Sequence, residues 1–215
     1  KYIKDLQASF DYAKIKYTDD YYDLTLNPDA PPLPPDWKVY FEGNFWGYSG
    51  RDNAGTEIKV DKQFDWAGHH WVIPSLYVCS KGLVLDFCMQ AEVEDIQAFI
   101  DKWHLNADND SCENFTREEQ MQMELDNPLS LDFEPSLVMN GKAMQTSHGS
   151  SLSYNPCLPE GITIEPEAKA AIEHYGLDTS YGWTITRAAY PWIGKRRPSG
   201  IKALSLTMEK RPYIL

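Results

Sequence analysis

The clearest hydrophobic pattern in the chain runs over residues 69–90, where two largely apolar stretches flank Lys81-Gly82. A pair of this kind between two strands is typical of a two-residue hairpin turn. That turn sets a register with three facing pairs: Cys79 with Val84, Tyr77 with Asp86, and Ser75 with Cys88. One face of the predicted hairpin is then apolar, except for Ser80 beside the turn. It comprises Val72, Pro74, Leu76, Val78, Leu83, Leu85 and Phe87.

The second face of this predicted hairpin combines aromatic rings with polar groups. Its candidate ligand-binding residues are His69, Trp71, Ser75, Tyr77 and Asp86. A few polar anchors on an apolar lining are typical of a ligand pocket. The competing interpretation, which these residue types favour, is packing beneath a helix or a second sheet. In that case the Tyr77 hydroxyl simply bonds to the Asp86 carboxylate.

Several other elements follow from hydrophobic spacing and from capping signals. Apolar residues at helical spacing, with acidic residues in the first turn, predict a helix over 93–103. Thr116 and Glu119 form a capping box for a short helix, and Glu165-Pro166 opens a helix that Gly176 ends. Alternation with period two predicts strands, and Asn140-Gly141 predicts a hairpin turn. The predicted strands cover 37–42, 58–60, 183–186 and 201–208.

The order of these elements predicts the fold class and the domain boundaries. Residues 1–26 form an N-terminal helical segment, 27–36 form a proline-rich connector, and 37–215 form the main domain. Proline fixes φ and removes a backbone donor, so the connector is neither a helix nor a central strand. Helices are scattered among hairpins rather than following each strand. We therefore predict an α+β domain, mainly antiparallel sheets of hairpins with about three or four packed helices.

The charge composition of the chain limits the classes of partner that it can bind. The formal net charge of the 215 residues is −12, which argues against nucleic acid and against an anionic membrane surface. No stretch approaches 18 consecutive apolar residues, so no membrane-spanning helix is predicted. The chain starts at Lys1 and ends on the apolar Tyr213-Ile214-Leu215. These ends favour a processed product or a part of a longer chain.

The cysteines and histidines do not indicate a metal site. None of the four cysteines belongs to a C-x-x-C pair, and the predicted register holds Cys79 and Cys88 beyond disulfide reach. Free thiols favour a reducing cytoplasm, while the pairing of Cys112 with Cys157 stays open. Neighbours on a strand point to opposite faces, so His69-His70 does not chelate one ion. No metal is predicted, and the absence of nucleotide-binding motifs predicts no cofactor.

The remaining charged motif is Lys195-Arg196-Arg197, the only basic cluster. It is a candidate anion-binding site, although a solvated loop is the favoured interpretation. We expect a binding or interaction domain for a small molecule, sugar or peptide that meets the aromatic and polar face. The alternative is a glycosidase-like hydrolase whose carboxylates converge only in the fold, with Asp86 and His69 as first candidates.

Overall fold

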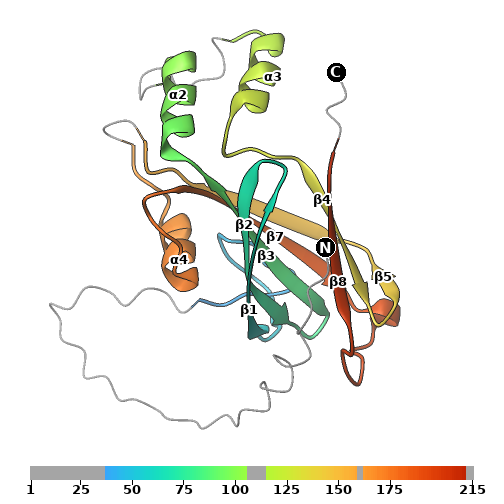
Figure 1. Cartoon of the computed structure of the whole chain (residues 1–215). Coiled ribbons are helices and arrows are strands. Elements are labelled where there is room, and N and C mark those ends of the chain that lie inside the picture. The colour runs from blue at the N-terminus through green and yellow to red at the C-terminus, as the bar shows by residue number, and fades with distance from the viewer. Residues whose placement is uncertain (1–36, 106–114, 159–161, 212–215) are drawn as a thin grey trace, which may run out of the picture.

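The computed structural model describes residues 37–105, 115–158 and 162–211. The predicted N-terminal helical segment and proline-rich connector lie outside these residues. Within them the chain forms two antiparallel sheets and three α-helices (Figure 1). The strands are β1 (Thr56–Trp66), β2 (His69–Val78), β3 (Gly82–Ala91), β4 (Phe133–Met139), β5 (Lys142–Met144), β6 (His148–Tyr154), β7 (Gly182–Pro191) and β8 (Leu204–Lys210). The α-helices are α2 (Val93–Trp103), α3 (Arg117–Asp126) and α4 (Pro166–Tyr175), and a short 3-10 helix covers Ile193–Lys195.

The two sheets share one hydrophobic core, and α4 covers the outer face of the larger sheet. The larger sheet has the order β1-β2-β3-β7-β6, and the smaller has the order β5-β4-β8. Apolar side chains of both sheets meet between them, for example Phe87 of β3 and Leu206 of β8. On the opposite face, Ala171 and Ile172 of α4 pack near Ile185 of β7. The result is three layers, namely helix, sheet and sheet (Figure 1). The α+β class with mainly antiparallel pairing is therefore as predicted.

The three predicted helices that fall within the described residues are found, with their end signals, where the sequence places them. The capping box of Thr116 and Glu119 opens α3, whose residues all remain at least partly exposed. Helix α4 ends at Gly176, which has the left-handed φ of 61°. Asn140 and Gly141, with φ values of 51° and 78°, join β4 to β5 as the predicted hairpin turn. None of the helices in the described part of the chain is long and apolar enough to cross a membrane.

The prediction of a strand over residues 37–42 is wrong. Val39 and Phe41 are buried and alternate with more exposed neighbours, but the segment joins neither sheet. Val39 accepts one hydrogen bond from the backbone of Gly55. The apolar side chains lie instead on the outer face of the larger sheet, against Tyr77 and its neighbours. An extended chain lying flat on a sheet has the same alternation of burial as a half-buried strand.

The predicted two-residue turn at Lys81-Gly82 is also wrong. Val78 faces Leu83, and Tyr77 faces Val84, so the pairing is displaced by two residues from the predicted one. Gly82 belongs to β3 and pairs with Pro191 of β7. A Cβ atom at Gly82 would collide with the carbonyl oxygen of Tyr190. This glycine therefore permits the close approach of β7 rather than a turn.

A bulge near Pro74 divides the face that the sequence predicts to be continuous. The register of β2 shifts between Val72 and Leu76 against β3, and it also shifts against β1. Proline lacks the N–H that a central strand donates, so it occurs in sheets at such bulges. As a result, Trp71 points into the core between the sheets, while Val72 packs on the side of α4. The placement of Trp71 on one face with Tyr77 is thus wrong.

The two described cysteines of the hairpin are free, as the sequence predicts for this pair. Cys79 and Cys88 are both buried. Burial raises the pKa of the Cys79 thiol to about 11, so the reactive thiolate is scarce at neutral pH. Cys112 lies outside the described residues.

Replacement of Gly82 tests the close approach of β7 to β3. We expect Gly82→Ala to lower the free energy of unfolding by about 1–3 kcal/mol, because the added methyl group overpacks the interior. Gly200→Ala is the matched control, since nothing lies within 4 Å of its added Cβ. Urea unfolding of both variants measures the difference. Equal stability of the two variants would contradict the packing around Gly82.

Candidate functional site

Asp86, the acid of the predicted binding face, forms a buried ion pair with Arg187. The two residues face each other on β3 and β7. Nε of Arg187 donates to Oδ1 of Asp86 at 2.8 Å, and Nη2 donates to Oδ2 at 2.7 Å. Asp86 is 0% exposed and Arg187 is 4% exposed. Two parallel hydrogen bonds of this kind give a strong, oriented pair.

Groups from two other segments complete the surroundings of this pair. The Tyr175 hydroxyl of α4 donates to Oδ2 of Asp86 at 2.5 Å. The Arg187 guanidinium lies 4.2 Å from the ring centre of Phe45 and 5.4 Å from that of Trp37. These distances are typical of cation–π contacts. The ion pair thus connects the sheet both to α4 and to the segment that precedes β1.

A chain of hydrogen bonds leads from the ion pair to Glu57 near the surface. The hydroxyls of Tyr175 and Tyr77 lie 2.8 Å apart, and the Trp37 indole also donates to Tyr77. Burial, followed by the charge of Asp86, raises the pKa of Tyr77 and also that of Tyr175. Both tyrosines therefore remain neutral, and the chain stays a hydrogen-bonded network.

Glu57 closes this network at the edge of α4. Its Oε1 accepts hydrogen bonds from Ser75 at 2.5 Å and from Lys59 at 2.9 Å, and it lies 2.9 Å from Nε2 of His174. Burial opposes ionisation, but the hydrogen bonds from Ser75, Lys59 and His174 outweigh it. They hold the pKa of the Glu57 carboxyl below its ordinary value.

The structure thus separates the residues of the predicted binding face. Ser75, Tyr77 and Asp86 do belong to one network, enclosed under α4, because the Tyr77 hydroxyl also lies 3.3 Å from Oε1 of Glu57, to which Ser75 donates. Tyr175 stands between Tyr77 and Asp86, where the sequence predicts a direct bond.

The other residues of the prediction lie elsewhere. Trp71 lies in the core between the sheets, and its indole donates to the Trp66 carbonyl oxygen. His69 is at the start of β2, and its Nδ1 lies 3.3 Å from the carbonyl oxygen of Gln90. The basic cluster begins at Lys195, the last residue of the 3-10 helix, and the side chains of Arg196 and Arg197 are exposed. Anion binding at this cluster remains a prediction.

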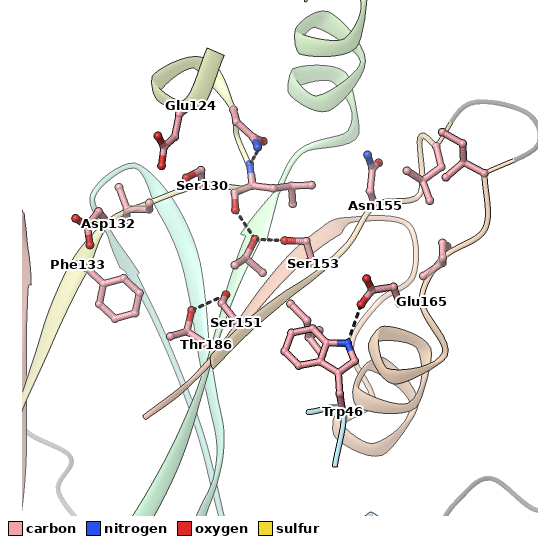
Figure 2. Close-up of a pocket in the computed structure, with 18 of the residues that line it drawn as sticks. Trp46, Glu124, Ser130, Asp132, Phe133, Ser151, Ser153, Asn155, Glu165 and Thr186 are labelled. Carbon is pink, nitrogen blue, oxygen red and sulfur yellow. Dashed lines mark hydrogen bonds between the residues drawn. The ribbon is translucent and has the colours of Figure 1, made fainter. Parts of the chain in front are cut away.

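An open cavity of about 830 Å³ lies on the inner side of the larger sheet, over β6 and β7 (Figure 2). We call it the Trp46 cavity. Its wall also includes α3, the residues before β4, and the residues from β6 to the start of α4. The polar and aromatic residues that shape it are Trp46, Glu124, Asp132, Ser151, Ser153, Glu165, Thr184 and Thr186. Its volume lies in the usual range for small-ligand sites.

The floor of the Trp46 cavity consists of paired hydroxyl groups. The register of β6 and β7 places Ser151 opposite Thr186, and Ser153 opposite Thr184. The oxygens of the first pair lie 3.2 Å apart, and those of the second lie 3.3 Å apart. On the next strand, β3, the inner face is apolar and packs against the smaller sheet. The inner face therefore changes from core to hydroxyl-bearing surface at β7.

The rim of the cavity carries an exposed indole and three carboxylates. Trp46 is 52% exposed, and its Nε1 donates to Oε2 of Glu165 at 3.4 Å. Figure 2 shows Trp46 and Glu165 on one side, with Glu124 and Asp132 on the other. Of the described residues that line the cavity, none is Lys, Arg or His. Such a surface suits neutral, hydroxyl-rich ligands and repels anions.

Sequence reasoning missed this cavity, although two signals are present in the sequence. Ser151 and Ser153 alternate along one strand, as do Thr184 and Thr186 along another, so each pair lies on one strand face. Their pairing depends on contacts between residues 35 and 31 positions apart in the sequence, which periodicity does not reveal. Trp46 stands in a glycine-rich loop whose path only the structure shows.

Comparison with known proteins gives no match. No protein-family model matches the chain, and searches of curated proteins and of solved structures find none either. Across the described ranges, no group of three or more His, Cys, Asp or Glu side chains is placed to hold a metal ion. The function is therefore argued from the geometry of this chain.

The ion pair can be tested by replacing one or both partners. Asp86→Leu leaves the buried Arg187 charge without its carboxylate, so we expect a loss of about 3–5 kcal/mol in the free energy of unfolding. The double variant Asp86→Leu with Arg187→Met should recover most of this loss, because no buried charge remains. Urea unfolding measures both. A double variant as unstable as the single one would contradict this account.

The lowered pKa of Glu57 predicts how the free energy of unfolding depends on pH. Its folded pKa lies below its ordinary value near 4.5. The stability that it contributes is therefore present above that value and is lost as the pH falls through the folded pKa. We expect Glu57→Gln to reduce the loss of stability below about pH 5. Denaturant unfolding from neutral to acidic pH measures this, with Glu209→Gln on β8 as control. Parallel stability profiles of Glu57→Gln and the unaltered chain would exclude the effect.

Proposed function

We propose that this domain binds a carbohydrate in the Trp46 cavity. The observation that carries the proposal is one open cavity that joins an exposed indole, paired hydroxyls and carboxylates, with no cationic side chain among the described residues of its lining. The domain is then a binding module, and the sugar is its ligand. Of the groups that the sequence predicts as a binding face, Ser75, Tyr77 and Asp86 belong instead to the network under α4.

Each part of the cavity matches a part of a sugar ring. The C–H face of a pyranose carries weakly positive hydrogens, which pack on the negative face of an indole such as Trp46. Sugar hydroxyls can both donate and accept, so they match the hydroxyl groups of Ser151, Ser153 and Thr186. Carboxylates are the stronger acceptors for the same hydroxyls. Glu165, held beside the indole by its hydrogen bond, places such an acceptor at the rim.

The absence of Lys, Arg and His from the described lining favours neutral sugars over uronic acids and sugar phosphates. Carboxylates line both sides of the cavity, and the whole chain has a net charge of −12. An anionic ligand would meet repulsion at the cavity and during approach. Neutral oligosaccharides are therefore the ligands to screen first.

The second candidate function is glycoside hydrolysis in the same cavity. Hydrolysis requires two carboxyl groups on opposite sides of the glycosidic bond. Glu165 lies on one side of the cavity, and Glu124 and Asp132 lie on the other (Figure 2). Asp86 has no such place, because it is fully buried and bonded to Arg187 and Tyr175. Hydrolysis thus remains the alternative function, and its candidate carboxylates are Glu124, Asp132 and Glu165 of the Trp46 cavity rather than Asp86.

Removal of the exposed indole tests carbohydrate binding. A thermal-shift screen of neutral oligosaccharides first selects a ligand, and isothermal titration calorimetry then measures its Kd. We expect Trp46→Ala to raise Kd at least about tenfold, because it removes the stacking surface. Ile193→Ala is the control, since Ile193 is also an exposed apolar residue but lies outside the lining. Unchanged affinity in Trp46→Ala would exclude the cavity as the binding site.

Neutralising the carboxylates separates binding from hydrolysis. Glu124→Gln, Asp132→Asn and Glu165→Gln keep the side-chain shapes but remove the charges. If the cavity only binds, the unaltered chain releases no reducing sugar, and each variant weakens binding modestly. Release of reducing sugar by the unaltered chain, abolished in one of these variants, would establish the hydrolase alternative instead.

A further inference from the structure

The hydroxyl pair of Ser153 and Thr184, in the floor of the Trp46 cavity, uses both of its hydrogens within the protein. Thr184 donates to the Leu129 carbonyl oxygen at 2.5 Å (Figure 2). A hydroxyl carries one hydrogen and two lone pairs. The bond of 3.3 Å between Ser153 and Thr184 therefore takes its hydrogen from Ser153. Towards the cavity, this pair offers lone pairs.

The second hydroxyl pair of the floor, Ser151 and Thr186, follows the same order. Ser151 donates to the Ile185 carbonyl oxygen at 3.4 Å, so the bond of 3.2 Å within the pair takes its hydrogen from Thr186. The four hydroxyls thus use their four hydrogens on four bonds within the protein. The floor is a row of hydrogen-bond acceptors.

The side-chain donors that the described lining leaves for a ligand are few and uncharged. The Trp46 N–H is already bonded to Glu165. The remaining donors are the amide groups of Asn127 and Asn155, whose oxygens accept backbone N–H bonds, and the hydroxyls of Ser130 and Thr163. A ligand with a few acceptors of its own satisfies them.

Carboxylates add charged acceptors at the rim of the Trp46 cavity. Glu124 has neither an ion-pair partner nor a hydrogen-bond partner in the described part of the chain. Glu165 accepts a bond from a neutral indole N–H. Asp132 lies 3.6 Å from Arg211, but that guanidinium also lies 3.5 Å from Glu134, so two carboxylates share one positive charge. The rim therefore carries uncompensated negative charge.

We propose that the sugar bound in the Trp46 cavity carries free, protonated amino groups. The inference rests on the proposed carbohydrate-binding function and names the class of sugar. A protonated primary amine has three donors and no acceptor, so it matches a site that consists mainly of acceptors. Its bonds to carboxylates are charge-assisted, and against the exposed face of Trp46 it makes a cation–π contact. A hydroxyl in its place forms only neutral bonds.

The sugar ring distinguishes this ligand from an aliphatic amine. The Trp46 side chain is 52% exposed and offers a flat surface to a pyranose ring. The uncharged donors of the lining, such as Asn155 and Ser130, need acceptors. Ring and hydroxyl oxygens of a sugar supply acceptors, whereas a fully protonated aliphatic amine has none.

Tetramers of β-1,4-linked glucosamine, N-acetylglucosamine and glucose, which differ only in the group at C2, test the inference. Isothermal titration calorimetry of the full 215-residue chain measures each Kd at about pH 6, below the pKa of about 7.7 typical of an α-amino group. We expect the glucosamine tetramer to bind at least about tenfold more tightly than the other two tetramers. Spermine, an aliphatic amine with four amino groups, should bind at least about tenfold more weakly than the glucosamine tetramer.

A double variant tests whether the rim carboxylates recognise the amine. Glu124→Gln with Glu165→Gln should reduce the ratio of the Kd values for the glucose and glucosamine tetramers at least about fivefold. The matched control is Glu118→Gln with Glu209→Gln, which removes the same charge from exposed positions outside the lining. The control should keep the ratio of the unaltered chain.

Several results would overturn the inference. If the glucose tetramer binds as tightly as the glucosamine tetramer, and Trp46→Ala weakens both, the amine has no role and carbohydrate binding stands. If the N-acetylglucosamine tetramer binds as tightly as the glucosamine tetramer, the charge is not recognised. If spermine binds equally well, or both double variants reduce the ratio equally, the net charge of −12 alone attracts cations. Binding by none of the tetramers also overturns it, while the screen of neutral oligosaccharides decides the proposed function separately.

Discussion

The buried ion pair of Asp86 and Arg187 is the interaction on which the arrangement of this domain depends. Burying two charges costs several kcal/mol for each ion unless hydrogen bonds and close contacts replace water. Here two Arg187 bonds, one Tyr175 bond and the rings of Trp37 and Phe45 do so. These partners come from α4 and from the segment before β1. The pair therefore holds three parts of the chain together.

This arrangement also positions the rim of the Trp46 cavity. Phe45 lies against Arg187, and the next residue in the chain is Trp46, whose indole stands at the cavity. Tyr175 fixes the end of α4 to Asp86, and Glu165 precedes the first turn of the same helix. The hydrogen bond between Trp46 and Glu165 thus joins two segments that the ion pair anchors. The buried network therefore holds the two segments that form this rim of the open cavity in place.

The inner face of the larger sheet explains why a cavity exists at all. Where the smaller sheet covers it, the side chains are apolar, as at Phe87 and Leu85. Beyond that cover, β6 and β7 present serine and threonine pairs, which water or a polar ligand can satisfy. An apolar continuation of the face would expose a hydrophobic patch. The change of residue type along β7 therefore marks the boundary between core and surface.

The sequence predicted local features well because local physics determines them. The caps of α3 and α4 and the turn at Asn140-Gly141 follow from residues close in the chain. The prediction of which residues share one face of the 69–90 hairpin is wrong for an identifiable reason. Pro74 forces a bulge, which moves Trp71 to the face between the two sheets. The sequence does contain a signal of this bulge, because proline within a strand is typical of a bulge or an edge.

The partner of Asp86 and the Trp46 cavity were beyond prediction from sequence. Arg187 lies 101 residues from Asp86, and its role depends on the pairing of β3 with β7. The cavity depends on four separate segments that meet in the fold. No periodicity encodes such contacts.

The most direct test of the central claim is to replace one hydroxyl pair of the cavity floor and to measure stability and sugar affinity together. The double variant Ser151→Ala with Thr186→Val removes both partners of one hydrogen bond. If the pair serves binding, the free energy of unfolding changes by less than about 1 kcal/mol, while the affinity for the oligosaccharide found by screening falls at least about tenfold. A marked loss of stability with unchanged affinity would contradict the account and make the hydroxyl floor a structural feature.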